Sequence, residues 1–434
     1  MSTVFDFKGA SGSGWSQPDS NFQNPDAVPE TLRRKSLPGW PRASEPELVR
    51  HYTLLSQKTF GIDTGFYPLG SCTMKHNPRV NERIVQLPGI DRIHPLQDSS
   101  QVQGLLAIYY EMQEMLAICS GMDAVTLQPV AGAQGEFTAI RCIQEYHRSR
   151  GDDHRDKVIV PDSAHGTNPA SASMCGYQII EIPSASDGRL DIDALRAAVG
   201  DDTAAMMITN PSTMGLFETN IAEASQIVHE AGGQMYYDGA NFNAIIGKTD
   251  PGRMGFDAVH YNLHKTFSQP HGGGGPGSGP IGVKSHLSEF LPTPLASRRE
   301  SQEGDSTGVG DGFHYFWQDV GDNSIGKVQQ WNGNAGAVVR AWAFYRRYGR
   351  DLERMSEYAV LNSNYLRHKI MNPDSDVAAK INCMPSEGSE ASLVMHEFTL
   401  SMSPVKELNG VTGKDVAKRL LDYGYMSPTL YFPQ

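Results

Sequence analysis

The sequence has few cysteines, and none of their spacings would build a structural site. Five occur in 434 residues, and no Cys-x-x-Cys pair is present. Disulfide frameworks and zinc sites require paired or closely spaced cysteines. The composition therefore excludes both kinds of site and indicates reduced thiols, a cytoplasmic protein and no bound metal.

Long apolar runs and excess positive charge are also missing. No window approaches the ~18 apolar residues of a membrane span, and the first residues, MSTVFDFKGASGSGW, lack the features of a secretory signal. The net charge of -12 argues against general binding to nucleic acid or anionic membranes, because either would require a basic surface. We therefore expect neither kind of partner.

The first part of the chain indicates an arm followed by helices. Residues 1–45 are rich in Ser, Asn, Pro and Gly, which predicts an extended segment. The stretch EPELVRHYTLLSQKTF has helical periodicity, and YPLGSCTMKHNPRVNERI, with two prolines, predicts a loop. A second helix is expected around residues 102–119.

The middle of the chain alternates between strands and helices. The segments that predict strands are DAVTLQPV, KVIVP, QIIEIP, TAAMMITNP and QMYYDGA. This alternation indicates an α/β fold with a mainly parallel sheet and helices on both faces. Because ligands bind beyond the carboxyl ends of such strands, we expect the polar loops there to converge on one site.

The alternation fades after residue 284. RRESQEGDSTGVGDGFH predicts a polar surface loop, and a long helix broken at Gly349 follows it. LVMHEFTLSM predicts a strand, and TGKDVAKRLLDYG predicts a helix with Thr412 as its N-cap. These elements indicate a small α+β domain. The predicted organisation is an arm at 1–45, a large domain at 46–295 and a small domain at 296–434.

Two residues at predicted strand ends suggest cofactor chemistry. Lys265, in HYNLHKTF, is either a surface charge or a nucleophile with a lowered ammonium pKa. Asp238, in MYYDGAN, is either a turn or cap residue or the partner of a protonated ring nitrogen. Their positions after successive strands together suggest the lysine Schiff base and the pyridinium partner of a pyridoxal phosphate site.

A phosphate holder is expected at AGAQGEFTAI. Gly132, Ala133, Gln134 and Gly135 lie where a helix begins, and small residues there let backbone N–H groups approach an anion. A simple tight turn explains the same pattern. His165, in SAHGTNPAS, is either a hydrogen-bonded surface residue or a residue that stacks on a cofactor ring.

The glycine run after Lys265, HGGGGPGSGP, does not open a helix. Its prolines indicate a shaped loop. We interpret it as a turn that lets backbone approach the cofactor of this site or of a partner subunit closely.

Four segments resemble one family: YPLGSCTMKHNP, DSAHGTNPASA, YYDGAN and NLHKTFSQPHGGGGPGSGPIGVK. They are similar to the glycine decarboxylase P-protein of the glycine cleavage system. The similarity runs from about residue 46 to the end, and the length resembles its C-terminal subunit (subunit 2) in the split bacterial form. The resemblance implies a fold type I, aspartate aminotransferase-like enzyme with pyridoxal phosphate. Its implied activity is glycine dehydrogenase (aminomethyl-transferring), which decarboxylates glycine, releases CO2 and passes the aminomethyl group to the lipoyl arm of H-protein.

The resemblance also implies roles for residues of this chain. Lys265 matches the Schiff-base lysine, Asp238 the partner of the pyridine nitrogen, and His165 the residue that stacks on the ring. The other matched positions are Ala240 for the second ring face, Ala133 and Gln134 for the phosphate, Asn262 and His264 for phosphate or substrate, and Ser71, Cys72 and Thr73 for the glycine carboxylate.

The resemblance implies partners as well. Subunit 1, a second homologous chain, would join this chain in a heterotetramer, and lipoylated H-protein would dock to it. The arm at 1–45 is the candidate for wrapping subunit 1. Family members usually continue past YMSPTLYFPQ, so we expect a small domain that is truncated at its end.

Two alternatives stay open at this point. Another fold type I enzyme, of desulfurase or lyase type, would share Asp238, Lys265 and His165 but not the PLGSCTMK-like and GGGGPGSGP-like loops. A non-catalytic structural subunit is suggested by the short C-terminus, but such a subunit is expected to have lost Lys265 or Asp238.

Overall fold

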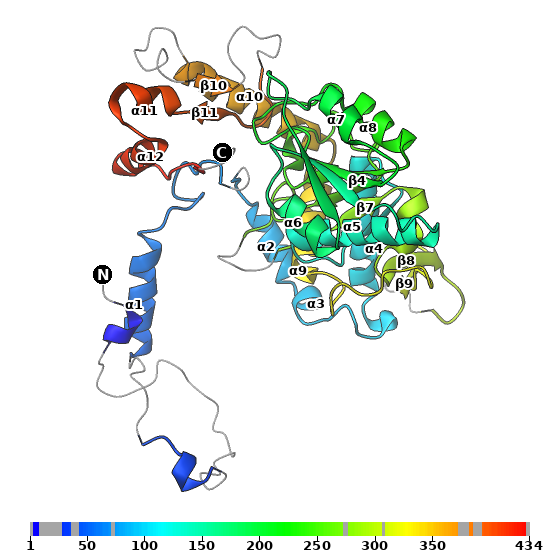
Figure 1. Ribbon diagram of the computed structural model, residues 1–434. Helices are drawn as coiled ribbons and strands as arrows, with labels where there is room; N and C mark the ends of the chain where they lie inside the picture. Colours follow the sequence, from blue (N-terminus) through cyan, green and yellow to red (C-terminus); the bar gives the residue numbers. More distant parts are fainter. Residues whose placement is uncertain are drawn as a thin grey trace. The chain divides into compact units, whose positions relative to one another are not determined.

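The computed structural model describes residues 3–7, 28–35, 43–70, 74–271, 277–305, 309–371, 382–384 and 393–430. The chain divides after Tyr67 into two compact units, Met1–Tyr67 and Pro68–Gln434 (Figure 1). Each unit is described by itself.

The described residues of the first unit contain one α-helix. Helix α1 (Glu45–Ser56) begins in a capping box between Ser44 and Glu47, which satisfies backbone groups of its first turn. The 3-10 turns η1 (Val4–Asp6) and η3 (Glu30–Leu32) precede it. No residue of α1 is buried, and the side chains of Val49 and Tyr52 are mostly exposed. The helix predicted here from periodicity is confirmed.

The second unit is built on a seven-stranded sheet. Its strands are β1 (Ala124–Thr126), β2 (Lys157–Pro161), β3 (Gln178–Ile182), β4 (Thr203–Ile208), β5 (Gln234–Gly239), β6 (Ala258–Tyr261) and β7 (Ile281–Val283). The spatial order is β1-β7-β6-β5-β4-β2-β3. Strands β2 to β6 run parallel, whereas β7 is antiparallel to both β6 and β1. The expected mainly parallel sheet is confirmed.

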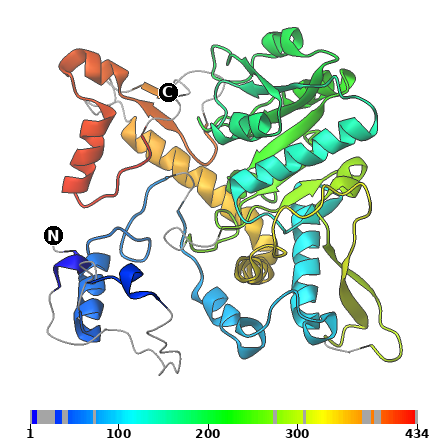
Figure 2. The ribbon, with the colours of Figure 1, turned by 60° about the horizontal axis from the view of Figure 1, so that its bottom comes forward.

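Helices cover both faces of this sheet (Figures 1 and 2). Helices α5 (Gly132–Ser149) and α6 (Thr167–Met174) pack on one face; α4 (Gln103–Ser120), α7 (Ile192–Ala198) and α8 (Ile221–Glu230) pack on the other. Along β5, Met235 and Tyr237 belong to the core under α4 and α8, whereas Tyr236 belongs to the core under α5. Successive side chains of a strand point to opposite faces, so both faces are buried.

A hairpin and a helix complete the packing around α4. Strands β8 (Leu295–Glu300) and β9 (Phe313–Gln318) pair antiparallel, and their buried residues Ala296 and Tyr315 join the α4 core. The predicted surface loop from 298 to 314 is therefore wrong at both ends, because residues 298–300 and 313–314 pair in this hairpin, which packs on α4. Helix α9 (Ala335–Tyr348) also packs on α4.

The remaining elements lie to one side of the sheet (Figure 2). Helix α10 (Leu352–Ile370) follows the 3-10 turn η7 (Gly349–Asp351); the break predicted at Gly349, whose φ is +47°, is confirmed. Strands β10 (Asn382–Met384) and β11 (Thr399–Ser401) pair, and α11 (Ser403–Asn409) and α12 (Gly413–Asp422) follow. Of the strand predicted from 393 to 402, only β11 forms. Thr412 caps α12 as predicted.

One predicted loop contains a helix. Helix α2 (Arg79–Val85), followed by α3 (Pro88–Asp91), begins inside the stretch YPLGSCTMKHNPRVNERI. The prediction of a loop is wrong there because α2 packs on α9, where the Glu82 carboxylate accepts two hydrogen bonds from the Arg340 guanidinium at 2.8 and 2.9 Å. The remaining 3-10 turns are η4 (Ser99–Gln101), η5 (Phe242–Ala244) and η6 (Ser285–Phe290). The predicted domain boundaries after residues 45 and 295 stay predictions.

Candidate active site

Asp238 lies at the carboxyl end of β5, on the face that α5 covers. Its Oδ1 accepts a hydrogen bond from the Ala240 backbone N–H at 3.0 Å. The register pairs it with His260 of β6, whose Nε2 lies 3.6 Å from Asp238 Oδ1. Burial lowers the pKa of His260 to about 4, so this imidazole is uncharged at neutral pH. The negative charge of Asp238 is therefore not matched by a cationic histidine.

Lys265 follows β6 in a tight turn. Its backbone N–H bonds the Asn262 carbonyl at 2.9 Å, and its side chain is half-buried. The charges of Asp238, Lys265 and His165 all act on the His260 imidazole. The three residues proposed as catalytic therefore lie within electrostatic reach of one buried imidazole, as expected for residues at the carboxyl ends of β2, β5 and β6.

His165 lies on the loop between β2 and α6. Its ring is exposed, and its Nδ1 lies 2.7 Å from Thr167 Oγ1. The same hydroxyl donates to Glu136 Oε1 at 2.8 Å. His165 is thus connected to Glu136 of α5 through one threonine.

The predicted phosphate turn is the N-terminus of α5. Ala131 is the N-cap, Gly132 the first helical residue, and Ala133 is exposed. The first N–H groups of a helix have no intrahelical acceptors and attract anions. The Gln134 side chain, in contrast, holds the turn itself, because its Oε1 accepts from Val130 N at 2.8 Å and its Nε2 donates to the Val328 carbonyl at 2.7 Å.

Asn262 lies against this turn. A Cβ added at Gly132 would lie 2.8 Å from Asn262 Oδ1, and that buried oxygen has no hydrogen-bond partner among the described residues. The end of the glycine-rich segment also approaches closely, since a Cβ at Gly279 would lie 2.0 Å from the Ala131 carbonyl oxygen. Small residues are therefore required on both sides of the α5 N-terminus.

His264 and Lys75 tie three segments together. The Lys75 ammonium donates to the His264 carbonyl at 2.6 Å, and His264 Nδ1 accepts from Ser278 N at 3.2 Å. Burial lowers the pKa of His264 to about 4. The uncharged His264 ring thus positions the chain beyond the glycine run, while Lys75 brings the 74–77 segment to the lysine loop.

Two sets of predicted residues lie outside the described part of the chain. These are Ser71, Cys72 and Thr73 and the glycine-run residues 272–276. Their predicted roles stay predictions.

Glu136, His260 and Lys75 were not predicted as site residues. Glutamate is a common residue inside helices, so Glu136 gave no distinguishing signal. His260 precedes Lys265 by five residues and lies inside strand β6. Lys75 lies within a quoted family segment, which was the one available signal.

The site fits pyridoxal phosphate by its donor set. It combines a buried carboxylate, a lysine, an exposed aromatic ring and a helix N-terminus flanked by small residues and the unpaired Asn262 Oδ1. These are the groups that a ring nitrogen, an aldehyde, a ring face and a phosphate require.

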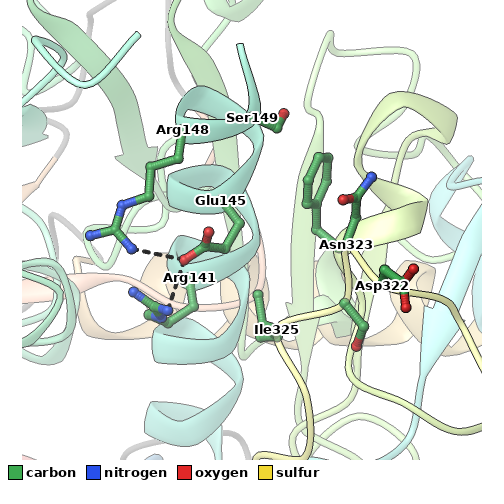
Figure 3. Close-up of a pocket in the computed structure, with 9 residues that line it drawn as sticks. Arg141, Glu145, Arg148, Ser149, Asp322, Asn323 and Ile325 are labelled. Atoms are coloured by element: carbon green, nitrogen blue, oxygen red, sulfur yellow. Dashed lines mark hydrogen bonds and ion pairs between the residues drawn. The ribbon is translucent and has the colours of Figure 1, made fainter. Parts of the chain in front are cut away.

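A separate surface pocket of about 490 Å³ lies against α5 between Arg141 and Ser149 (Figure 3). There Glu145 Oε1 bonds both Arg141 Nη2 and Arg148 Nη1 at 2.9 Å. None of the predicted site residues lines it.

Comparisons with known proteins agree along most of the chain. Residues 135–292 match the family model described as Aminotransferase class-V, and residues 355–434 match that described as Glycine dehydrogenase, C-terminal domain. The probable glycine dehydrogenase (decarboxylating) subunit 2 of Thermococcus gammatolerans is 50% identical over 410 residues, covering 94% of this chain and 77% of the relative. The chain belongs to the glycine dehydrogenase (decarboxylating) subunit 2 family. The member from Thermococcus kodakarensis is 49% identical over 432 residues, covering 99% of this chain and 82% of its own length.

Solved structures support the fold of this subunit 2 family member. A crystal structure of glycine decarboxylase (P-protein) of the glycine cleavage system, in inhibitor-bound form, aligns with a TM-score of 0.69 at 16% identity, covering 94% of this chain and 85% of the other. The Escherichia coli cysteine desulfurase CsdA aligns at 0.57 with 18% identity, covering 84% of each chain. At these identities the likeness shows the fold alone, and it confirms the predicted α/β class.

Proposed function

We propose that this chain uses pyridoxal phosphate to decarboxylate glycine, releasing CO2, and transfers the remaining aminomethyl group to the lipoyl arm of an H-protein. The observation that carries the proposal is the placement of Asp238 and Lys265 at the carboxyl ends of adjacent strands, next to the α5 N-terminus. Membership of the glycine dehydrogenase (decarboxylating) subunit 2 family selects glycine as the substrate.

Four features of the chain would hold the cofactor. Lys265 would bind it covalently through Nζ, and Asp238 would hold a proton on the ring nitrogen. His165 and Ala240 would lie against the two ring faces. The backbone of Ala133 and Gln134, with Asn262 beside them, would hold the phosphate.

The bound cofactor would supply a ring that withdraws the electron pair left when glycine loses CO2. The protein's part is electrostatic. The Asp238 carboxylate is buried, and the neighbouring His260 stays uncharged because burial holds its pKa at about 4. This carboxylate is consequently placed to stabilise a cation, the protonated ring nitrogen, in surroundings where charge interactions are strong.

The glycine carboxylate is assigned to the 71–73 loop. The assignment rests on the family resemblance of Ser71, Cys72 and Thr73; Lys75, two residues further on, bonds the His264 carbonyl beside Lys265. The proposed role of His264 is indirect. Its ring accepts a hydrogen bond from the Ser278 backbone N–H and so positions the chain there.

Partners follow from the family. The names of the relatives include subunit 2, so a second subunit is expected; we infer that it is a homologous subunit 1 in a heterotetramer. The proposed contact is the arm at 1–45 together with α1; no residue of α1 is buried. No described helix has the length and apolar character that crossing a membrane demands. A cytoplasmic location stays a prediction.

The test is exchange of labelled bicarbonate into glycine by the chain with subunit 1, lipoylated H-protein and pyridoxal phosphate. Lys265→Ala should abolish exchange and the borohydride-sensitive visible absorbance while circular dichroism stays unchanged, because Nζ alone binds the cofactor covalently. Lys284→Ala is the matched control. Lys284 donates a hydrogen bond to the Gly121 carbonyl, and its replacement should retain the absorbance.

The same experiment separates the alternatives. Lysine-bound cofactor without any exchange would support another fold type I enzyme, of the desulfurase or lyase type. A wild-type chain that binds no cofactor would support a structural subunit. Near-native exchange by Lys265→Ala would overturn the assignment of the lysine.

A further inference from the structure

Glu136 is a buried carboxylate that the proposed reaction leaves without a role. It is the fifth residue of α5 and is 4% exposed. Both of its oxygens accept from hydroxyls of α6, Oε1 from Thr167 Oγ1 at 2.8 Å and Oε2 from Ser171 Oγ at 3.1 Å. Burial, reinforced by the charge of Asp238, raises the pKa of Glu136 to about 7.

Thr167 connects this carboxylate to His165. Its Oγ1 is 2.7 Å from His165 Nδ1, and a hydroxyl carries a single hydrogen. When Thr167 donates to ionised Glu136, Nδ1 must carry the imidazole hydrogen and donate to Thr167. When Glu136 is protonated, it donates to Thr167, whose hydrogen then points to Nδ1. In that second case Nδ1 is an acceptor, and the Thr167 backbone N–H, 3.3 Å away, donates to it as well.

We propose that Glu136 is a positioning residue that sets the tautomer of His165 through the Thr167 hydroxyl. Ionised Glu136 leaves the lone pair of His165 on Nε2; protonated Glu136 moves the hydrogen to Nε2. The relevance to catalysis rests on the proposed function, in which His165 lies against the cofactor ring. The hydrogen-bond linkage itself is a property of this chain.

The proton balance of the change is simple. A proton that binds Nε2 releases the Nδ1 proton to Thr167, and the Thr167 hydroxyl proton passes to Glu136 Oε1. The imidazole is neutral before and after, the threonine is regenerated, and the carboxylate loses its negative charge. One proton is taken up from outside, and no heavy atom has to move.

The groups that face Glu136 fix the direction of its titration. Asp238, from β5, disfavours its ionised form, whereas Lys265 and the two α6 hydroxyls favour it. From the sheet, Tyr236 stays protonated because burial raises its pKa, and His260 stays uncharged. The linked titration is therefore expected in the neutral range.

Nitrogen NMR of the full-length chain labelled with 15N-histidine tests the proposal. Spectra would be recorded from about pH 5.5 to about pH 8.5, where a histidine and a raised carboxyl titrate, and the His165 signals assigned by their loss in His165→Gln. In the wild-type chain, Nδ1 should change from acceptor-type to hydrogen-bearing as the pH rises through neutrality. An imidazolium, with both nitrogens hydrogen-bearing, is recognised separately.

Four variants sharpen the test. Glu136→Gln and Thr167→Val should make the tautomer independent of pH, and Thr167→Ser should restore the wild-type profile. Ser171→Ala, the matched control, removes the other Glu136 partner without touching His165. It should keep the change but displace its midpoint to higher pH, because the ionised carboxylate loses a hydrogen bond.

A tautomer profile in Glu136→Gln or Thr167→Val that equals the wild-type profile would overturn the proposal, provided that thermal unfolding shows these variants to be folded. A chain that shows the linked titration but no bicarbonate exchange would retain the linkage and overturn the proposed function alone.

Discussion

The carboxylate of Asp238 is buried between the sheet and α5 beside an imidazole that stays neutral. The two side chains are paired in register across β5 and β6, so the residue opposite this buried carboxylate in the sheet contributes no positive charge. A buried carboxylate of this kind requires a positive partner. We expect a bound ligand to bring that cation to the site.

Asp238→Asn should lower the rate of bicarbonate exchange by about 100- to 1,000-fold, because the loss of one preorganised electrostatic contact to a developing charge lowers a rate by about that factor. Cofactor should still bind through Lys265. Exchange measured at saturating pyridoxal phosphate checks this expectation.

Asp257→Asn is the control for Asp238→Asn. Asp257 is also buried, and its Oδ2 is 2.7 Å from His229 Nε2, away from the predicted site residues. The Asp257→Asn variant should have a lower melting temperature but should keep the wild-type rate of bicarbonate exchange. Wild-type rates in Asp238→Asn would contradict the role of this carboxylate.

At the scale of residues, local pattern indicated Lys265, Asp238 and His165 because each follows a short apolar strand. Glu136 and Lys75 could not be found in that way. Their positions depend on contacts across long sequence separations, Glu136 with α6 and Lys75 with the lysine loop.

Among the elements, the chain segment that enters β7 and the N-terminus of α5 form one tightly packed joint. Gly277 and Gly279 face the carbonyls of Val130 and Ala131 at distances that leave no room for a Cβ. The backbone that would carry the cofactor phosphate is therefore supported from behind by the end of the glycine-rich segment.

Gly279→Ala should displace the start of α5, since its Cβ would lie 2.0 Å from the Ala131 carbonyl oxygen. Overpacking costs about 1–3 kcal/mol, which corresponds to roughly a 5- to 150-fold weaker cofactor affinity if all of it falls on binding. Titration of visible absorbance with pyridoxal phosphate measures the effect.

Gly104→Ala is the control for Gly279→Ala, because nothing lies within 4 Å of a Cβ there, and it should leave cofactor affinity unchanged. An equal affinity in both variants would contradict a supporting role of the joint.

Elements with strong local periodicity were predictable, among them α4, the parallel strands and the helix pair broken at Gly349. Helix α2 and the β8–β9 hairpin were missed because their stability comes from packing, α2 through the Glu82–Arg340 ion pair and β8–β9 through residues buried on α4. Tertiary contacts override weak local propensity in short elements.

For the molecule as a whole, buried ionisable groups make stability depend on pH. Burial raises the pKa of Glu218 to about 7, although its Oε2 accepts from Leu190 N at 3.0 Å. The folded chain therefore holds a proton on Glu218 that the unfolded chain releases between its usual pKa and about 7. Stability from this group is lost as the pH rises through that window.

Glu218→Gln should remove this loss. Relative to wild type, the variant should gain up to about 3 kcal/mol of unfolding free energy between acidic pH and pH above neutrality. Denaturant unfolding at a series of pH values checks the slope.

Glu223→Gln, at an exposed glutamate paired with Arg196 at 2.6 Å, is the control and should show a constant difference from wild type. A Glu218→Gln difference that does not change with pH would contradict the assignment of a raised pKa to Glu218.

The reversed strand β7 has a consequence for synthesis of the chain on the ribosome. Among the described strands, β1 pairs with β7 alone, Ala124 opposite Val283, so β1 and the adjacent α4 must wait for the whole sheet to be translated. Until then the apolar face of α4, including Leu106, Met112 and Leu116, has no complete core to enter. Exposed apolar surface of this kind favours aggregation. Nascent chains that end before β7 are therefore the species that most need a chaperone.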